Sequence, residues 1–372
     1  MQMHDHPTDP KPRSRLTPGV RRDVLIDRAA FRLVSSRVDR PDDGELARIE
    51  EEIRIALEVF DREGWIDDPG SYHRAPPPAE GMRSASRRSG TVRYVGLSWL
   101  DGYAPHPHEP GSDRFLAYPR NNVARAMVLE HRSTAPPWLV ILHGFGMGSA
   151  ALDLRAFRAL RLHRDLGLNV AFLTLPFHGL RSSGPITRPV MPSADVMDTV
   201  HGLTQAVWDT RQLLAHLRAR THQPIGLLGL SLGGLVAALV ASLDKPDAAV
   251  LVVPAVDLPG LMADATASDM LDADDGELGA EVLRRARPIF APVSPLQLTP
   301  RVPHAHRTVI AGTLDQFARP STQAVEIWRH WDEPELHWYH GGHASVFWAS
   351  GVQDSIDAAL RHAGLVASAG SR

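Results

Sequence analysis

The sequence contains no cysteine and almost no lysine. Without cysteine, disulfide bonds, thiolate zinc sites, cysteine nucleophiles and cysteine-bound iron–sulfur clusters are excluded. Lys11 and Lys245 are the only lysines, so arginine carries nearly all of the positive charge. The formal net charge of −3 provides no overall field that favours nucleic acid or an anionic membrane, and neither is expected as a partner.

Long apolar runs are also scarce. Residues 1–15 are polar and proline-rich and lack the apolar core of a signal peptide, so the expected location is cytoplasmic. The most apolar stretch, residues 227–243, is slightly short for a membrane span and is interrupted by glycine and serine. We therefore expect no integral membrane span and interpret this stretch as a buried strand, a tight turn and a buried helix.

The first 90 residues differ from the rest and are predicted to form an N-terminal helical extension. Helices are expected over residues 20–38 and 43–62, and apolar residues of the second helix recur at spacings of three and four. Asp42 or Asp43 is suited to cap that helix, and Gly64 to end it. Residues 67–90 are rich in Pro, Gly, Ser and Arg, which indicates a linker or a long surface loop. We expect the apolar stripe to pack on the domain that follows.

Residues 91–372 are predicted to form a single α/β domain. Strands are expected at 91–99, 114–118, 124–130, 137–142, 170–175, 225–229, 248–253, 307–311 and 336–339, and helices at 152–166, 197–218, 232–243, 322–330 and 345–363. Apolar strands that alternate with helices are typical of a mostly parallel sheet covered by helices on both faces. Residues 255–303 interrupt this alternation, and we expect them to form a small active-site cap; a plain insertion packed on the sheet edge is the alternative.

Ser231 stands between a predicted strand and a predicted helix, in the segment Gly-Leu-Ser-Leu-Gly-Gly. A sharp strand-to-helix turn lifts a serine hydroxyl above the sheet edge, and small residues two positions before and two after prevent clashes. Gly229 and Gly233 hold those two positions. The pattern predicts a catalytic nucleophile at a helix N-terminus, where amide groups face developing negative charge. The alternative is a glycine-rich turn whose serine has no catalytic role.

An acyl-transfer site also needs fixed donors for the oxyanion. The amide of Leu232, directly after the serine, is the first expected donor. The second is expected from the His-Gly-Phe-Gly turn at 143–146, where we choose the amide of Phe145. Residues 146–151 also fit the dinucleotide-binding pattern G-x-G-x-x-A. Because the next strand ends without an acid for a ribose hydroxyl, no cofactor is expected.

Taken together, the motifs resemble those of the α/β-hydrolase superfamily from about residue 91 to residue 363. The resemblance is carried by HGFG at 143–146, PFHG at 176–179, GLSLGG at 229–234, an aspartate after a late strand and a histidine near the end. Members of that superfamily carry their catalytic residues in the order serine, acid, histidine. The resemblance implies Ser231 as the nucleophile, Asp315 as the acid and His343 as the base.

The positions of the acid and the base support these roles independently. Asp315 follows the strand predicted at 307–311, and His343 follows the strand predicted at 336–339 through two glycines. Both residues should therefore lie at the carboxyl edge of the sheet, where open parallel sheets bind ligands. Asp257 follows another strand and is the alternative acid.

With 19 histidines in the chain, metal binding has to be considered. His337, His340 and His343 are spaced by three, and His304 and His306 flank Ala305. No carboxylates stand near them at ligand spacing, so no metal is expected. His337 and His340 remain weaker candidates for the catalytic base.

Missing motifs narrow the reaction class. The sequence has neither the GxxxxGK[ST] phosphate loop nor the HExxH zinc motif. We predict a carboxylesterase-like serine hydrolase that acts on a small-molecule acyl ester or thioester. An acyltransferase or peptidase with the same triad, or a binding protein that keeps the fold without catalysis, is the alternative. The sequence leaves the oligomeric state open.

Overall fold

A computed structural model of the chain describes residues 10–12, 22–27, 29, 41–132, 135–182, 191–267 and 281–367. Of the helix predicted at 20–38, residues 22–27 and 29 are helical, and the remaining positions lie outside the described residues. Residues 268–280, which belong to the insertion predicted at 255–303, lie outside them as well.

The core of the fold is a nine-stranded sheet in the order β1-β2-β3-β5-β4-β6-β7-β8-β9. Neighbouring strands from β5 to β9 are parallel, whereas β1, β2 and β3 are antiparallel to their neighbours. The strands are β1 (Arg83–Ser89), β2 (Val92–Leu100), β3 (Val123–Leu129), β4 (Trp138–Leu142), β5 (Asn169–Thr174), β6 (Ile225–Leu230), β7 (Ala248–Val252), β8 (Arg307–Gly312) and β9 (Glu335–Tyr339). The predicted parallel sheet is confirmed.

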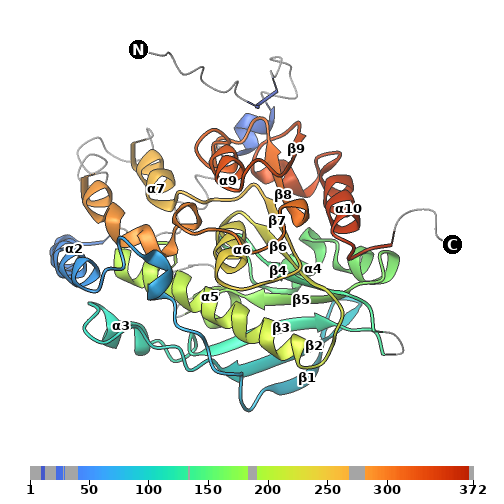
Figure 1. The fold of residues 1–372 in the computed structure, drawn as a ribbon, viewed down its shortest axis with the longest axis horizontal. Helices are drawn as coiled ribbons and strands as arrows, with labels where there is room; N and C mark the ends of the chain where they lie inside the picture. Colours follow the sequence, from blue (N-terminus) through green and yellow to red (C-terminus); the bar gives the residue numbers. More distant parts are fainter. Residues whose placement is uncertain are drawn as a thin grey trace.

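Helices cover both faces of this sheet (Figure 1). In β4, Val140 and Leu142 join one hydrophobic cluster, whereas Leu139 and Ile141 join the other, as the two-residue period of a strand requires. The first cluster includes side chains of α5 (Val196–Arg218), α6 (Leu232–Leu243) and α9 (Ala324–His330). The second includes side chains of α4 (Ala150–Ala156) and α10 (Val352–His362). The central strands are therefore buried on both sides.

Helix α2 (Asp43–Arg62) lies against this domain through its apolar stripe. Asp42 caps the helix in a capping box with Glu45, which satisfies two amides at its start. The buried side chains of the stripe, including Ile53 and Phe60, belong to the same hydrophobic cluster as α5. Arg114 adds an ion pair to Glu52 of α2 and further pairs to Asp195 and Asp198 at the start of α5.

Two local predictions were wrong. Arg83–Ser89, expected in a linker or loop, forms strand β1 along the edge of the sheet. Residues 114–118, expected to be a strand, fall mostly within helix α3 (Ser112–Leu116), which buries Phe115. Strand β1 is formed by hairpin pairing with the adjacent β2, and Phe115 of α3 packs on the distant residues Phe177 and His201, so tertiary contacts outweigh the local pattern.

Two predicted helices are each interrupted. Within the helix expected at 152–166, α4 ends at Ala156, Arg158 takes a positive φ of 48°, and the π-helical turn η2 (Arg161–Asp165) follows. The closing helix expected at 345–363 is divided into a single turn, η7 (Ala344–Phe347), and α10.

The insertion between β7 and β8 packs mainly onto the helical layer. It begins with α7 (Leu258–Ala267) and includes the turn η4 (Arg287–Val293), which contacts both α2 and α5. Ile289 and Phe290 of η4 are buried in the same cluster as α5. Within the described part of the chain, no helix is both long enough and apolar enough to span a membrane.

Candidate active site

Ser231 occupies the sharp turn between β6 and α6. Its backbone has φ 53° and ψ −114°, a conformation that costs a non-glycine residue on the order of 1–3 kcal/mol. The turn is held by several backbone hydrogen bonds. The Ser231 amide donates to the carbonyl of Val252 at 2.9 Å, and the Ser231 carbonyl accepts from Gly234 and Leu235 at 2.8 and 3.1 Å. A strained backbone conformation that is maintained by hydrogen bonds to both the amide and the carbonyl of the residue is typical of a functional turn.

The glycines around Ser231 are required by close backbone packing. A Cβ atom on Gly229 would lie 2.3 Å from the carbonyl oxygen of Gly233. A Cβ on Gly233 would lie 2.1 Å from the carbonyl oxygen of Leu142, at the end of β4. Helix α6 therefore approaches β4 and β6 more closely than any side chain at these two positions would allow.

Three predicted site residues come together at the carboxyl edge of the sheet. Nε2 of His343 lies 3.0 Å from Oγ of Ser231, and Nδ1 of His343 lies 2.7 Å from Oδ2 of Asp315. A carboxylate only accepts hydrogen bonds, so Nδ1 carries the proton and Nε2 of the neutral ring accepts from the serine hydroxyl. Asp315 follows β8 and His343 follows β9, two neighbouring parallel strands. This hydrogen-bonded chain is the arrangement that makes a serine hydroxyl nucleophilic.

The carboxylate of Asp315 is fixed from its other side. Oδ1 accepts from the amides of Phe317 and Ala318 at 2.9 and 2.8 Å. The alternative acid, Asp257, lies elsewhere: its carboxylate pairs with Arg287 at 3.2 Å and accepts from the amide of Gly260.

Two opposing effects act on His343. Burial disfavours the charged ring, but the neighbouring carboxylates of Asp315 and Asp27 outweigh burial and raise the pKa of His343 above 6.5. These carboxylates would stabilise an imidazolium if the ring took the serine proton.

The two residues expected to supply oxyanion donors lie on either side of Ser231. Leu232 is the first residue of α6, so its amide has no acceptor one turn earlier in the helix. Phe145 lines the same cavity as Ser231, and a Cβ on the neighbouring Gly144 would lie 3.5 Å from Cβ of Ser231. The turn at 143–146 is thus close enough to Ser231 to supply a second donor.

His143, to which the sequence analysis gave no role, fixes that turn. Its Nε2 accepts from the amide of Leu175 at 3.0 Å, and its Nδ1 donates to the carbonyl of Gly144 at 2.8 Å. Burial and the nearby His178 lower the pKa of His143 to about 3, so the ring stays neutral. The side chain fastens the loop after β4 to the end of β5.

The cavity beside Ser231 has a volume of about 180 Å³. Its lining is mostly apolar, with the exceptions of Ser231, His343 and Asp27, and the other members are Phe145, Met147, Leu152, Leu230, Phe317, Ala344, Val346 and Phe347. Among the described residues of the insertion at 255–303, none lines it. Asp27 comes from the N-terminal segment and was missed by the sequence analysis, because no local pattern connects it with a turn more than 300 positions away.

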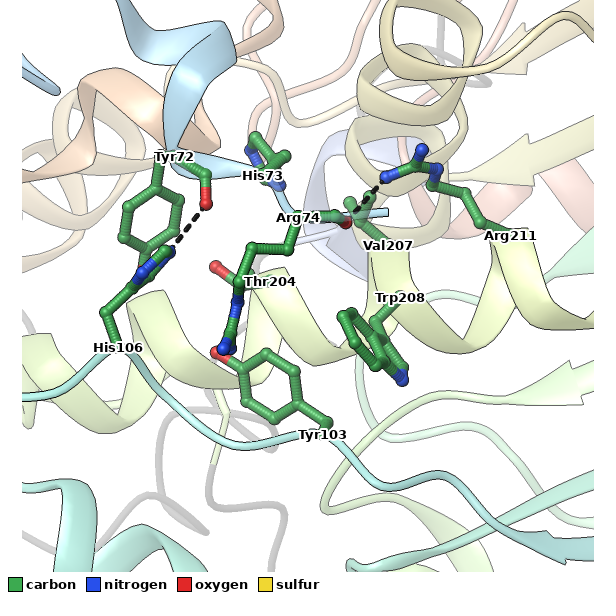
Figure 2. A pocket seen from close by; sticks show the side chains of 9 residues that line it. All are labelled: Tyr72, His73, Arg74, Tyr103, His106, Thr204, Val207, Trp208 and Arg211. Carbon is green, nitrogen blue, oxygen red and sulfur yellow. Dashed lines mark hydrogen bonds between the residues drawn. The ribbon is translucent and has the colours of Figure 1, made fainter. Parts of the chain in front are cut away.

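A second, much smaller cavity lies between α5 and the segment before β1 (Figure 2). Its volume of about 10 Å³ is roughly the space needed by one water molecule. The lining residues are Tyr72, His73, Arg74, Tyr103, His106, Thr204, Val207, Trp208 and Arg211. Ser231 and His343 both line the larger cavity, which is therefore the candidate substrate site.

Within the described ranges, no three histidine or carboxylate side chains are grouped so that they could hold a metal ion. His304 and His306 instead hydrogen-bond to the backbone carbonyls of Asp332 and Asp247. His337 lies 2.9 Å from the carboxylate of Glu335.

Comparisons with known proteins identify the family and the fold. Residues 139–368 match the model of the "Alpha/beta hydrolase family". Two uncharacterized proteins of Mycobacterium tuberculosis, from strains CDC 1551 and H37Rv, are each 40% identical to the chain over 321 residues, which is 86% of this chain and 76% of theirs. An acetyl xylan esterase from Paenibacillus sp. R4 is similar in structure, with a TM-score of 0.53 at 15% identity over 84% of this chain and 94% of the esterase. The chain belongs to the α/β hydrolase family and has its fold.

Proposed function

We propose that this hydrolase cleaves a small carboxylic ester or thioester through an acyl-enzyme intermediate. The observation that carries the proposal is the hydrogen-bonded chain from Ser231 through His343 to Asp315, at the wall of an apolar cavity. A serine nucleophile, an imidazole base and an orienting carboxylate are the set that acyl transfer requires.

In the first half of the reaction, Oγ of Ser231 attacks the carbonyl carbon while its proton passes to Nε2 of His343. The amides of Leu232 and Phe145 donate to the oxyanion, and each such donor is worth about 3–4 kcal/mol in the transition state. The imidazolium then gives its proton to the leaving alcohol or thiol as the carbonyl bond re-forms.

In the second half, water replaces the alcohol. His343 takes a proton from the water, whose oxygen attacks the acyl-enzyme, and then returns the proton to Oγ of Ser231. The products of this half are a carboxylic acid and the free enzyme. The proposed reaction steps require no cofactor or metal.

The cavity favours a short to medium, uncharged acyl group. Its 180 Å³ is small beside the ~300–1,000 Å³ of typical ligand pockets. No arginine or lysine lines it among the described residues, and the carboxylate of Asp27 does, which disfavours an anionic substrate.

A fluorophosphonate probe tests the nucleophile. Wild-type protein should be labelled, and Ser231→Ala should not. Ser242→Ala is the matched control, because Ser242 is also buried in α6 but bonds to the carbonyl of Ala238. Equal labelling of wild type and Ser231→Ala would refute the proposal.

A p-nitrophenyl ester series from acetate to palmitate, run beside aminoacyl amides, tests the reaction itself. We expect a maximum on short or medium esters. A maximum on an amide would indicate a peptidase, and labelling without turnover of any substrate would indicate a binding protein.

A further inference from the structure

Asp27 joins the N-terminal segment to the active site. The residue lies in the helical stretch 22–27 and is only 2% exposed. Its Oδ2 accepts from the amide of His343 at 2.7 Å, and its Oδ1 accepts from the amide of Ala344 at 2.9 Å. Oδ2 also lies 3.4 Å from the amide of Gln316, the residue after Asp315. One carboxylate thus contacts both the loop that carries the base and the loop that carries the acid.

We infer that Asp27 is a positioning residue that locks the loops of Asp315 and His343 together in their catalytic arrangement. The inference rests on the function proposed above. The carboxylate bonds to backbone amides and not to the imidazole, so Asp27 acts through the loops. Hydrogen bonds from amides to an ionised acceptor are about twice as strong as neutral ones, which suits this carboxylate to hold two loops in one geometry.

The fit between Asp27 and the loop is tight. A Cβ atom on Gly342 would lie 2.2 Å from Oδ2 of Asp27 and 2.5 Å from its Cγ. Gly342 does not have a positive φ, so the glycine is needed here for space and not for its backbone conformation. The absence of a side chain at Gly342 is what lets the carboxylate reach the amide of His343.

The charge of Asp27 also acts on the base. Among the described residues, Asp315 acts on both Asp27 and His343, whereas the charge of Asp23 acts on the nearby Tyr339 and not on His343. Burial and the nearby Asp315 raise the pKa of Asp27, and the charge of Asp27 in turn helps to raise the pKa of His343. Removing this charge should lower the pKa of His343.

Asp27→Asn tests the inference with a side chain of the same size. We expect kcat/KM for a p-nitrophenyl ester to fall by roughly 10-fold to 100-fold, the scale on which small misplacements of catalytic groups act. The acid limb of the pH–rate profile should also shift to lower pH. Asp23→Asn is the matched control: Asp23 lies one turn earlier, is also buried, and pairs with Arg22 at 3.0 Å. This variant should keep the rate of the wild type.

A purely structural role for Asp27 would lower the amount of folded enzyme but leave the pH profile of the active fraction in place. An Asp27→Asn profile that coincides with that of the wild type therefore overturns the inference. Failure of the proposed function is distinguishable, because the wild-type protein itself would then fail to turn over an ester, whereas failure of this inference leaves wild-type turnover intact.

A double-mutant cycle keeps the inference testable if Asp27→Asn folds poorly. Gly342→Ala should cost far more kcat/KM in the wild type than in Asp27→Ala, where the carboxylate that would clash is absent. If the fold loss of kcat/KM in the double variant equals the product of the losses in the two single variants, the two residues do not interact. That result would contradict the inference.

Discussion

Replacing Asp315 by asparagine should reverse the hydrogen-bond polarity of the site. In the wild type, Oδ1 accepts from two amides while Oδ2 faces Nδ1 of His343. The asparagine oxygen must stay toward the amides of Phe317 and Ala318, because the opposite orientation would leave two buried donors unpaired at about 1–3 kcal/mol each. The amide nitrogen then points at Nδ1.

A donor at that position forces the wrong tautomer on the imidazole. Nδ1 has to accept, Nε2 carries the proton, and the ring no longer takes the proton of Ser231. We expect kcat to fall by about 10⁴-fold, which corresponds to about 5.5 kcal/mol of transition-state stabilisation. Steady-state hydrolysis of p-nitrophenyl butyrate measures the loss, and far-UV circular dichroism checks that the fold survives.

Asp257→Asn is the matched control for this experiment. Its carboxylate binds Arg287 and the amide of Gly260 and does not contact His343, so turnover should stay close to that of the wild type. If Asp315→Asn kept most of its activity, or if Asp257→Asn lost it instead, the assignment of the acid would be wrong.

Three more predictions follow from the structure. Because the pKa of His343 is raised above 6.5, kcat/KM should increase as the pH rises through that pKa and the ring becomes neutral. The stability that the charged ring contributes is fully present below pH 6.5 and is lost as the pH rises through the raised pKa. A value of kcat/KM that falls as the pH rises from 6.5 would contradict this prediction. Deleting residues 1–66 should give poorly soluble protein, since it uncovers the surface packed against Phe60, and a truncated chain that is soluble, monomeric and active would show the extension to be dispensable. Gly233→Ala should lower the free energy of unfolding by about 3 kcal/mol in urea titrations, because its Cβ meets the Leu142 carbonyl at 2.1 Å, and an unchanged midpoint would mean that α6 shifts freely.

The sequence predicted the parallel part of the sheet well because these strands are buried on both sides. Continuous apolar runs such as Trp138–Leu142 leave few alternatives to a central strand. Strand β1 carries no such signal: Arg83–Ser89 is almost wholly exposed and polar, and only its pairing with β2 makes it a strand. Because β1 lies exposed at the edge of the sheet, its sequence shows no alternation of apolar and polar residues from which a strand could be predicted.

The same contrast applies to the active site. Ser231 is recognisable because its glycines lie within a few positions of it, and the backbone clashes they avoid are local. The acid was harder to choose, because Asp257 and Asp315 both follow strands and only the three-dimensional contact with His343 separates them. Asp27 was out of reach, because its partners lie at the other end of the chain.

The two hydrogen bonds of Asp27 connect distant parts of the chain. The residues that they join, His343 and Ala344, are separated from Asp27 by 316 and 317 positions in the sequence. During synthesis, Asp27 therefore leaves the ribosome 316 residues ahead of His343, and the contact between them can form only after strand β9 has been made.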